Sequence, residues 1–423
     1  MFGLIRLYVV RVMKNAQQLT FLLLAGLCSS PWIQAQSTEL RHDNARWLHS
    51  AILAGDWLVN NQEKRTNGSQ PFSADYGRWL YEYKLPDRSW RGSTCWTTAT
   101  GIMALSSLYE RTGFPRYKEA LTRAALYLKS LQILDFRNQL LYGALAEHTP
   151  LSDFSFPRDG VTGGLGGYLA LYRLTGDKEY LERAELFGNW FLRAGINPQT
   201  QWPYYTVRFD GRHIGPSDSK ASYMEAWQAG SGLYFYQLYK VTGKRIYFDK
   251  GVVPFAEGLV GKSPEMGLLR RAKENNDDFA TITLLCAYRE LGDKRYWDAA
   301  IQRLTWLMDS QREDGAVVPG NTGGVYISAL TALDAMDLAA EKKLAIDAAR
   351  LRRFVRRCAE FAVTVQETKP DDVKAFGGFY GQLNLADFRR EWIHARATTY
   401  SVIFNLRNEG LVKVPFYSAF GWD

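Results

Sequence analysis

Two adjacent carboxylates, Asp277 and Asp278, stand directly before a long apolar run and are the first candidates for chemistry. Hydrolysis of a glycosidic bond needs one protonated and one ionised carboxyl group flanking that bond. A third acid, Asp159, precedes the glycine-rich run GVTGGLGGYLA and could supply the partner. The alternative for all three is helix capping, because an Asp at a helix start accepts hydrogen bonds from free backbone N–H groups. The catalytic candidates are therefore Asp277, Asp278 and Asp159.

Aromatic and charged residues gather in stretches without helical periodicity, and the densest of these is 201–225. Aromatic rings stack on the apolar faces of sugars, and arginine forks bind carboxylates. Tyr, His and Arg together could also remove the C5 proton of a uronate, which is lyase or epimerase chemistry. A packed surface loop without a ligand is the alternative. The substrate-binding candidates are Trp90, Trp96, Tyr204, Tyr205, Arg208, His213, Asp218, Glu225, His394 and Arg396.

Other kinds of site have no support in the sequence. It contains no phosphate-binding loop, no dinucleotide fingerprint and no His-Glu-x-x-His motif, so we predict neither a cofactor nor a metal. It has no basic run of the kind that binds nucleic acid. The net charge of +8 falls to +5 without residues 1–35, and this basic excess suits an anionic ligand or an anionic cell surface but is also common in envelope proteins that bind neither. Cys95, Cys286 and Cys358 lack metal-type spacing and are predicted to be buried free thiols.

The candidates must be positioned by helices, because the chain repeats one helix–turn–helix unit. In its clearest copy, 277–291 is apolar or small nearly all round, and 294–311 is amphipathic. A glycine turn separates the two helices, and a Tyr follows that glycine by four residues. The turns lie at Gly113, Gly176, Gly243 and Gly292. A second repeated pattern is an aromatic residue five positions before a glutamine, and it occurs at Gln62, Gln132, Gln311 and Gln366.

Twelve helices of alternating type, in six pairs, account for the whole chain after its first residues. Helices that are apolar on all sides need neighbours on both sides, so we predict an all-α closed ring, an (α/α)6 toroid with essentially no sheet. The inner-to-outer connections are tight, whereas most outer-to-inner connections are long. Long loops inside a compact repeat are usually functional. We therefore expect the binding cleft at the N-terminal ends of the inner helices, where these loops meet.

The first 35 residues have the features of an export signal. Arg6, Arg11 and Lys14 precede the short apolar run 21–26, and Ala35 ends a small-residue cleavage site. The apolar run is too short for a stable membrane span. We predict cleavage near Ala35, a periplasmic or secreted protein, and one toroidal domain over 36–423 without a transmembrane segment. Retention of the leader as an anchor is the alternative.

The Tyr-x-x-Thr-Gly-Asp turns, the Trp-Leu…Gln…Asp-Gly endings of outer helices and the helix count resemble the six-hairpin glycosidase-like proteins. These are carbohydrate-active enzymes with an (α/α)6 barrel, and the resemblance covers nearly the whole chain after the leader. It implies the fold more than the reaction, because that fold hosts hydrolases, polysaccharide lyases and sugar epimerases.

The Asp277-Asp278 pair and the Tyr-x-x-x-Gly-Asp that follows it resemble the adjacent-aspartate motif of the bacterial α-1,6-mannanase family. The resemblance implies that these two residues are the nucleophile and the acid/base. Asn275-Asn276 departs from the motif, which has aromatic residues before the pair.

The leading interpretation is an exported glycoside hydrolase that cleaves a poly- or oligosaccharide with two carboxylates. A polysaccharide lyase or uronate epimerase acting on an acidic glycan is the first alternative, favoured by the Arg, Tyr and His residues of 201–225 and by the basic charge. The second alternative is a non-catalytic glycan-binding protein of envelope polysaccharide assembly.

Overall fold

The computed structural model describes residues 31–68, 70–71, 73–215, 228–261, 275–276, 278–382, 384–408, 410 and 418. The chain divides into two units, Met1–Trp47 and Leu48–Asp423, and helix α2 (Pro31–Asn61) begins in the first and ends in the second. None of the described helices is both long and apolar enough to cross a membrane. Every candidate site residue belongs to the second unit.

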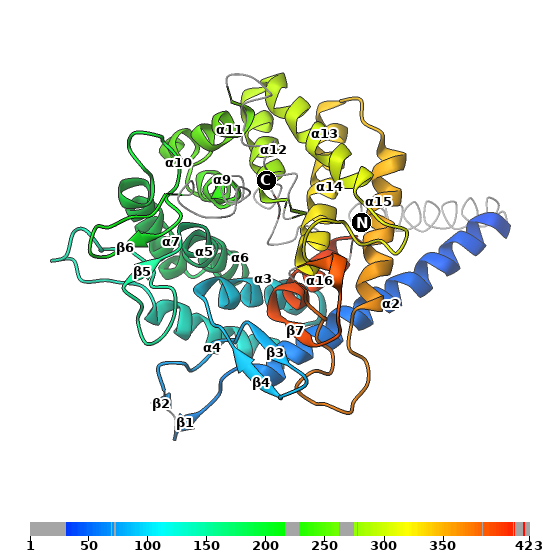
Figure 1. Cartoon of the computed structure of the whole chain (residues 1–423), viewed down its shortest axis with the longest axis horizontal. Helices are drawn as coiled ribbons and strands as arrows, with labels where there is room; N and C mark the ends of the chain where they lie inside the picture. The colour runs from blue at the N-terminus through cyan, green and yellow to red at the C-terminus, as the bar shows by residue number, and fades with distance from the viewer. Residues whose placement is uncertain are drawn as a thin grey trace, which may run out of the picture. The chain divides into compact units, whose positions relative to one another are not determined.

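An inner ring of helices organises the second unit (Figure 1). Its members are α3 (Cys95–Thr112), the continuous α5–η1–α6 (Pro157–Val161, Thr162–Gly167, Tyr168–Thr175), α9 (Ser231–Thr242), α12 (Phe279–Leu291), α14 (Thr322–Lys342) and α16 (Ala395–Asn408). Each packs against the next in this order, and α16 packs against α3. The ring is therefore closed, which explains why these helices are apolar or small nearly all round.

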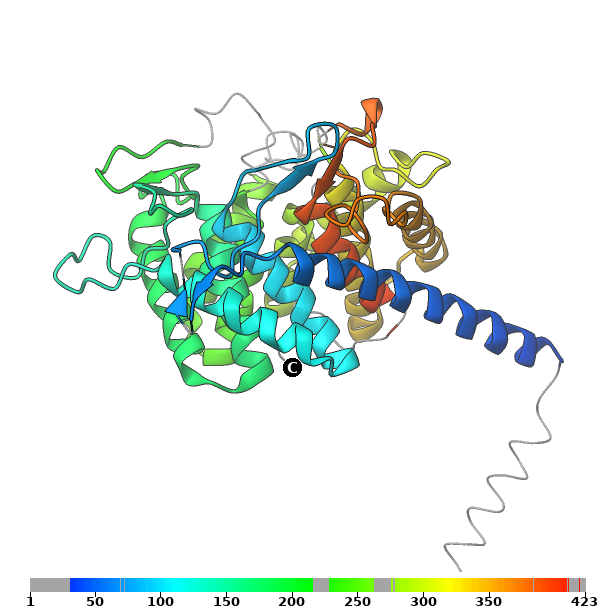
Figure 2. The same cartoon turned by 90° about the horizontal axis from the view of Figure 1, so that it is seen from below.

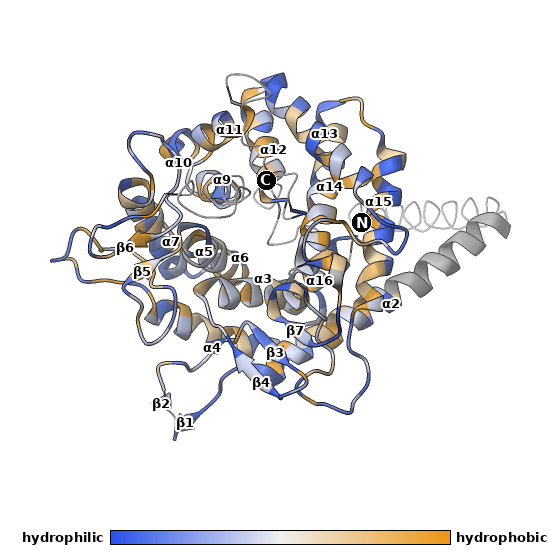
Figure 3. Cartoon of the chain, in the orientation of Figure 1, coloured by the Kyte–Doolittle hydropathy of each residue, from blue (hydrophilic) through white to orange (hydrophobic). Residues whose placement is uncertain are grey.

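An outer helix follows each of the first five inner helices and packs against it. The outer helices are α2, α4 (Pro115–Ser130), α7 (Lys178–Trp190) with its π-helical end η2 (Phe191–Gly195), α10–α11 (Arg245–Gly251, Val253–Val260), α13 (Lys294–Asp309) and α15 (Ala348–Thr364). Apolar residues recur along these helices, and the loops are mostly hydrophilic (Figure 3). The described residues thus form the twelve alternating helices of the predicted (α/α)6 toroid.

The predicted turn glycines end inner helices. Gly113, Gly176, Gly243 and Gly292 all adopt left-handed conformations, with φ of 68°, 72°, 70° and 68°. A residue without Cβ is favoured there because L side chains clash at positive φ. The close spacing of the glycines in η1 has another cause: a Cβ at Gly164 would overlap the Phe187 ring of α7. These glycines allow close helix packing, and they leave no room for a sugar.

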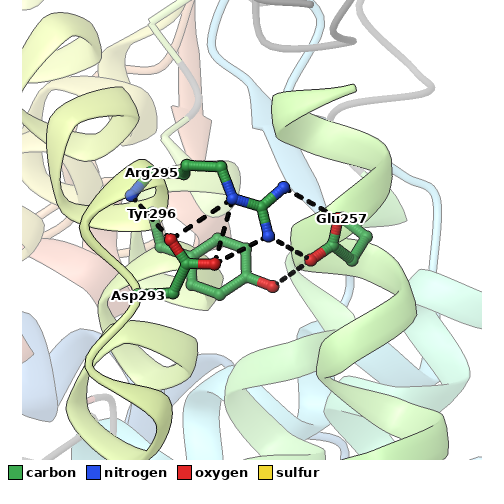
Figure 4. A network of polar contacts seen from close by, with 4 residues as sticks. All are labelled: Glu257, Asp293, Arg295 and Tyr296. Atoms are coloured by element: carbon green, nitrogen blue, oxygen red, sulfur yellow. Dashed lines mark hydrogen bonds and ion pairs between the residues drawn. The ribbon is translucent and has the colours of Figure 1, made fainter. Parts of the chain in front are cut away.

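The tyrosine that follows a turn glycine ties neighbouring outer helices together. Its hydroxyl bonds to a carboxylate on the preceding outer helix in the pairs Tyr117–Asp56, Tyr247–Glu185 and Tyr296–Glu257. Figure 4 shows the last pair with Arg295, whose Nη2 lies 3.0 Å from Glu257 and 2.7 Å from Asp293. The repeated Tyr therefore marks a contact between successive hairpins.

The repeated glutamine makes the second contact between hairpins. In each copy, Nε2 donates to the carbonyl of a glycine in the loop that follows and to a carbonyl of the next outer helix. The acceptors are Gly77 and Ala120 for Gln62, Gly143 and Arg183 for Gln132, Gly315 and Phe354 for Gln311, and Gly377 and Ser50 for Gln366. The last set joins α15 to α2 and closes the outer ring.

Short antiparallel strands of two or three residues lie in the long loops. They are β1 (Thr66–Asn67) with β2 (Gln70–Pro71), β5 (Phe154–Ser155) with β6 (Val207–Arg208), and a three-stranded sheet β4–β3–β7 (Ser89–Arg91, Glu82–Lys84, Trp392–His394). The three-stranded sheet sets Glu82 opposite His394, so the loop before α3 lies beside the loop before α16. The three-stranded sheet lies at one end of the ring (Figure 2).

Candidate active site

A cavity of about 200 Å³ opens at the N-terminal ends of three inner helices. It is lined by Tyr81, Gly92, Thr94, Trp96, Asp159 and Arg396. Thr94 caps α3 by accepting a hydrogen bond from the Thr97 N–H at 3.1 Å, and Trp96 follows in the first turn. Asp159 and Arg396 stand in the first turns of α5 and α16. Three residues proposed from the sequence, Trp96, Asp159 and Arg396, therefore meet in one cavity.

Asp159 shares a hydrogen bond with a second carboxyl group, that of Glu147. Glu147 is buried, and its Oε2 accepts from Cys95 Sγ at 3.7 Å and from the Phe156 N–H at 3.4 Å. Its Oε1 meets no N–H or hydroxyl donor among the described residues. A buried acceptor without a donor is costly, so this oxygen favours the protonated form of the carboxyl, which can donate a hydrogen bond to Asp159.

Both carboxyl groups have raised pKa values, but the two shifts differ in their causes. Burial, reinforced by the charge of Asp159, raises the pKa of Glu147 well above its usual range. Burial also raises the pKa of Asp159 to about 6, although the charges of Arg158 and Arg396 and the hydrogen bond from Glu147 act to lower it. The hydrogen bond between the two groups raises the pKa of Glu147 and lowers that of Asp159, so a shared proton favours Glu147, and the pKa of Asp159, about 6, lies close to neutrality.

The chain positions Glu147 through its backbone. The Cys95 N–H donates to the Glu147 carbonyl at 2.7 Å, which fastens the loop to the first turn of α3. The Glu147 N–H donates to Ser152 Oγ at 2.8 Å. We did not single out Glu147 from the sequence. The sequence feature that marks it is a lone acid directly after the apolar run 144–146. A charged side chain in such a buried stretch is rarely without a partner.

Aromatic rings form one wall of the cavity. The Trp96 ring centroid lies 6.0 Å from that of Tyr81 and 6.0 Å from that of Tyr400. The Arg396 guanidinium carbon lies 5.6 Å from the Trp96 centroid. Such a wall offers an apolar face, and Arg396 offers N–H donors, so the cavity can hold a ring that is apolar on one side and rich in oxygen on the other.

His394 supports this wall from behind. Its ring centroid lies 4.7 Å from that of Tyr81, and its Nε2 bonds to Glu82, which also accepts from Arg91. His394 is buried and does not line the cavity. It therefore lies next to the site as a positioning group for Tyr81.

Asp278 lies away from the cavity lining and caps α12. It is fully buried, and its Oδ1 accepts from Thr281 Oγ1 at 2.7 Å and from Arg303 Nε at 3.4 Å. Burial raises its pKa, against the charge of Arg303. This is the capping arrangement considered for Asp278 from the sequence. Its neighbour Asp277 lies outside the described residues.

The candidates of 201–225 do not join the cavity where the structure describes them. Tyr204 packs against His213 with centroids 4.7 Å apart, and Tyr205 packs 5.6 Å from Phe156. Arg208, on β6, bonds to Asp153 at 3.1 Å. Asp218 and Glu225 lie outside the described residues. Trp90 lies on β4 and lines a different cavity.

No protein-family model and no curated protein matches this sequence. Solved structures do match. An unsaturated glucuronyl hydrolase specific for heparin is 16% identical, with a TM-score of 0.58 over 88% of this chain and 100% of its own. Cellobiose 2-epimerase from Bacillus thermoamylovorans is 13% identical, with a TM-score of 0.63 over 89% of this chain and 100% of its own. An α-1,6-mannanase from a Salegentibacter species is 16% identical, with a TM-score of 0.53 over 86% of this chain and 100% of its own.

These similarities confirm the predicted (α/α)6 toroid and the resemblance to six-hairpin glycosidase-like enzymes at the level of the fold. The chain shares that fold with glycoside hydrolases and with sugar epimerases. Because one fold hosts several reactions, the reaction must be argued from the cavity itself.

Proposed function

We propose that the protein is a glycoside hydrolase that binds a sugar unit in the cavity between Tyr81 and Arg396 and uses Asp159 as its general acid. The observation that carries this proposal is the Asp159–Glu147 carboxyl pair at the cavity. A general acid works best when its pKa lies near the working pH, and that of Asp159 is raised to about 6.

In the first step, protonated Asp159 donates its proton to the glycosidic oxygen while the bond from that oxygen to the anomeric carbon breaks. The carboxylate left on Asp159 accepts the hydrogen bond from Glu147, which keeps its own proton. Arg158 and Arg396 also favour this ionised form. Glu147 is buried, so it acts on the substrate only through Asp159.

Water must then reach the anomeric carbon with the help of a second carboxylate. Asp277, Asp218 and Glu225, which lie outside the described residues, remain the predicted sources of that group. Trp96 and Tyr81 would stack on the sugar ring, and Arg396 would hydrogen bond to its oxygens.

Sugar epimerisation or lyase chemistry is the second candidate. It is favoured by the fact that Asp159 is the sole carboxylate among the described residues that line the cavity. Once ionised, Asp159 could serve as a base that removes a proton from a carbon of the sugar, with no partner carboxylate required. A glycan-binding protein without turnover is the third candidate.

The test is incubation with a panel of neutral and acidic oligosaccharides, followed by three measurements on the same samples. New reducing ends without ultraviolet absorption support the hydrolase. An absorbing, unsaturated product supports a lyase, and an isomer seen by NMR supports an epimerase. Binding without any product would leave the third candidate, and loss of each product in Asp159→Asn ties it to this cavity.

We also propose that the protein is exported to the periplasm or the medium and loses its leader near Ala35. It rests on the basic start, the short apolar run 21–26 and the small residues that end at Ala35. The first residue of the protein recovered from the cell envelope or the medium tests it. Recovery of an intact Met1 terminus from the cytoplasm would contradict it.

A further inference from the structure

A second cavity, of about 270 Å³, lies beside the β3–β4 hairpin and has no role in the function proposed above. Leu80 and Trp90 line this cavity, whereas Tyr81 and Gly92, from the same hairpin, line the first one. The two cavities therefore share one structural element. A glycan chain that crosses this hairpin could contact both.

Positive charge predominates in the lining of the second cavity, where Arg65, Arg78 and Lys374 face a single carboxylate, Glu63. That carboxylate is already engaged, since both of its oxygens accept from Arg65, at 2.8 and 2.7 Å. Lys374 is exposed and makes no ion pair within the described part of the chain. This lining can accept an anionic group without displacing an existing pair.

Protein groups engage Arg78 only in part. Its Nη2 pairs with Asp75 at 2.8 Å, and its Nε is buried and has no hydrogen-bond partner among the residues that the structure describes. Cations also crowd just outside the lining: burial and the charges of Arg123 and Lys374 lower the pKa of Lys64. An anion bound here would relieve that repulsion.

Trp90 supplies a fixed aromatic surface in the same cavity. It is partly exposed, and its centroid lies 4.9 Å from that of Tyr83 and 6.0 Å from that of Trp57. The Trp57 Nε1–H donates to the Lys374 carbonyl at 2.8 Å. The aromatic cluster therefore also holds the backbone from which the Lys374 side chain extends.

We propose that the second cavity is a binding subsite for a carboxylate- or sulfate-bearing sugar residue, in which Trp90 stacks on the ring and Lys374 and Arg78 hold the anionic group. Tryptophan faces suit the C–H face of a sugar, and exposed ammonium and guanidinium groups suit its acid. The subsite rests on the proposed function only in taking the bound glycan as the substrate, because binding here needs no turnover.

The test is calorimetric titration of the full chain carrying Asp159→Asn, which prevents turnover. The titrants are acidic hexasaccharides from polygalacturonate, alginate, hyaluronan and chondroitin sulfate, with mannohexaose and maltohexaose as neutral counterparts. At least one acidic hexasaccharide should bind more tightly than both neutral ones. The carboxylated and the sulfated titrants distinguish the two kinds of acid.

Two added substitutions locate that binding. Lys374→Ala removes an exposed charge, and Trp90→Leu removes the ring without changing net charge. Each should raise the Kd about tenfold, the effect of losing roughly 1.4 kcal/mol. Arg356→Ala is the control, because Arg356 is also exposed but pairs with Glu360 on α15. It should leave the Kd unchanged.

The proposal is overturned if no acidic hexasaccharide binds, if the neutral ones bind equally well, or if the Lys374 and Trp90 variants behave like Arg356→Ala. A loss with Lys374→Ala but not Trp90→Leu would mean charge attraction without sugar stacking and would also overturn it. If binding follows the prediction while the parent protein cleaves nothing, the subsite stands and the hydrolase proposal fails.

Discussion

Gln366 donates from Nε2 to the carbonyl oxygen of Ser50 at 3.0 Å, and its Oε1 accepts from the Ser50 hydroxyl at 2.7 Å. The two residues are 316 positions apart, and both are buried. They join α15 to α2, the last outer helix to the first. The same Nε2 also donates to the Gly377 carbonyl at 3.0 Å. One side-chain amide therefore holds together the two ends of the outer ring and the loop that follows α15.

Gln366→Ala should therefore destabilise the fold. The substitution leaves the carbonyls of Ser50 and Gly377 without this donor in a buried place, which costs about 1–3 kcal/mol. Urea unfolding should show a lower midpoint with an unchanged slope. Gln139→Ala is the control, because Gln139 lies in an exposed loop and its side chain bonds only locally, to the Phe136 carbonyl. Equal midpoints for the two variants would contradict the closure role.

Asp159→Asn should abolish turnover while the fold is retained. The amide keeps the shape of the side chain and removes the transferable proton, so the rate should fall at least about a hundredfold. Thermal unfolding should change little, because burial already penalises the ionised carboxyl. The measurement is kcat/KM on any glycan that the parent protein converts. Near-normal turnover would remove Asp159 from the mechanism.

Asp278→Asn should give the opposite pattern. Its Oδ1 caps α12 and accepts from Arg303 in a buried setting, so loss of the charge should cost about 1–3 kcal/mol of unfolding free energy. Turnover per folded molecule should stay near that of the parent, since Asp278 does not line the cavity. A large loss of turnover at full stability would instead support the adjacent-aspartate mechanism inferred by resemblance.

The pH profile should depend on Glu147 in a specific way. A general acid must be protonated, so kcat/KM should fall as pH rises through the pKa of Asp159, about 6. The hydrogen bond from Glu147 lowers that pKa. Glu147→Leu removes the bond and should move the falling limb to higher pH. Glu147→Gln keeps an N–H donor and should leave the limb near its original place.

If the falling limb of the pH profile stays in place in both variants, Glu147 does not affect the pKa of Asp159. If the limb moves equally in both, packing and not the hydrogen bond is responsible. Both variants should be compared at equal folded fraction, measured by circular dichroism, because Glu147 is buried.

The sequence by itself determined the fold, because its evidence is local and repeated. A left-handed glycine, an apolar inner helix and a Tyr or Gln at constant spacing can each be recognised within a few residues, and their repetition predicts a closed ring. It also indicated Trp96, Asp159 and Arg396, since helix starts in such a ring converge on one face.

Only the tertiary structure decided which groups meet. The β3–β7 register brings Glu82 to His394, 312 positions away, and so fixes the Tyr81 side of the cavity. Folding buries Glu147 beside Asp159, and burial together with their interaction shifts the pKa values of both. These relationships depend on long-range packing and on exclusion of water, and neither leaves a periodic trace along the chain. For the same reason Trp90 on β4 and Trp96 on α3, although only six positions apart in sequence, line two different cavities.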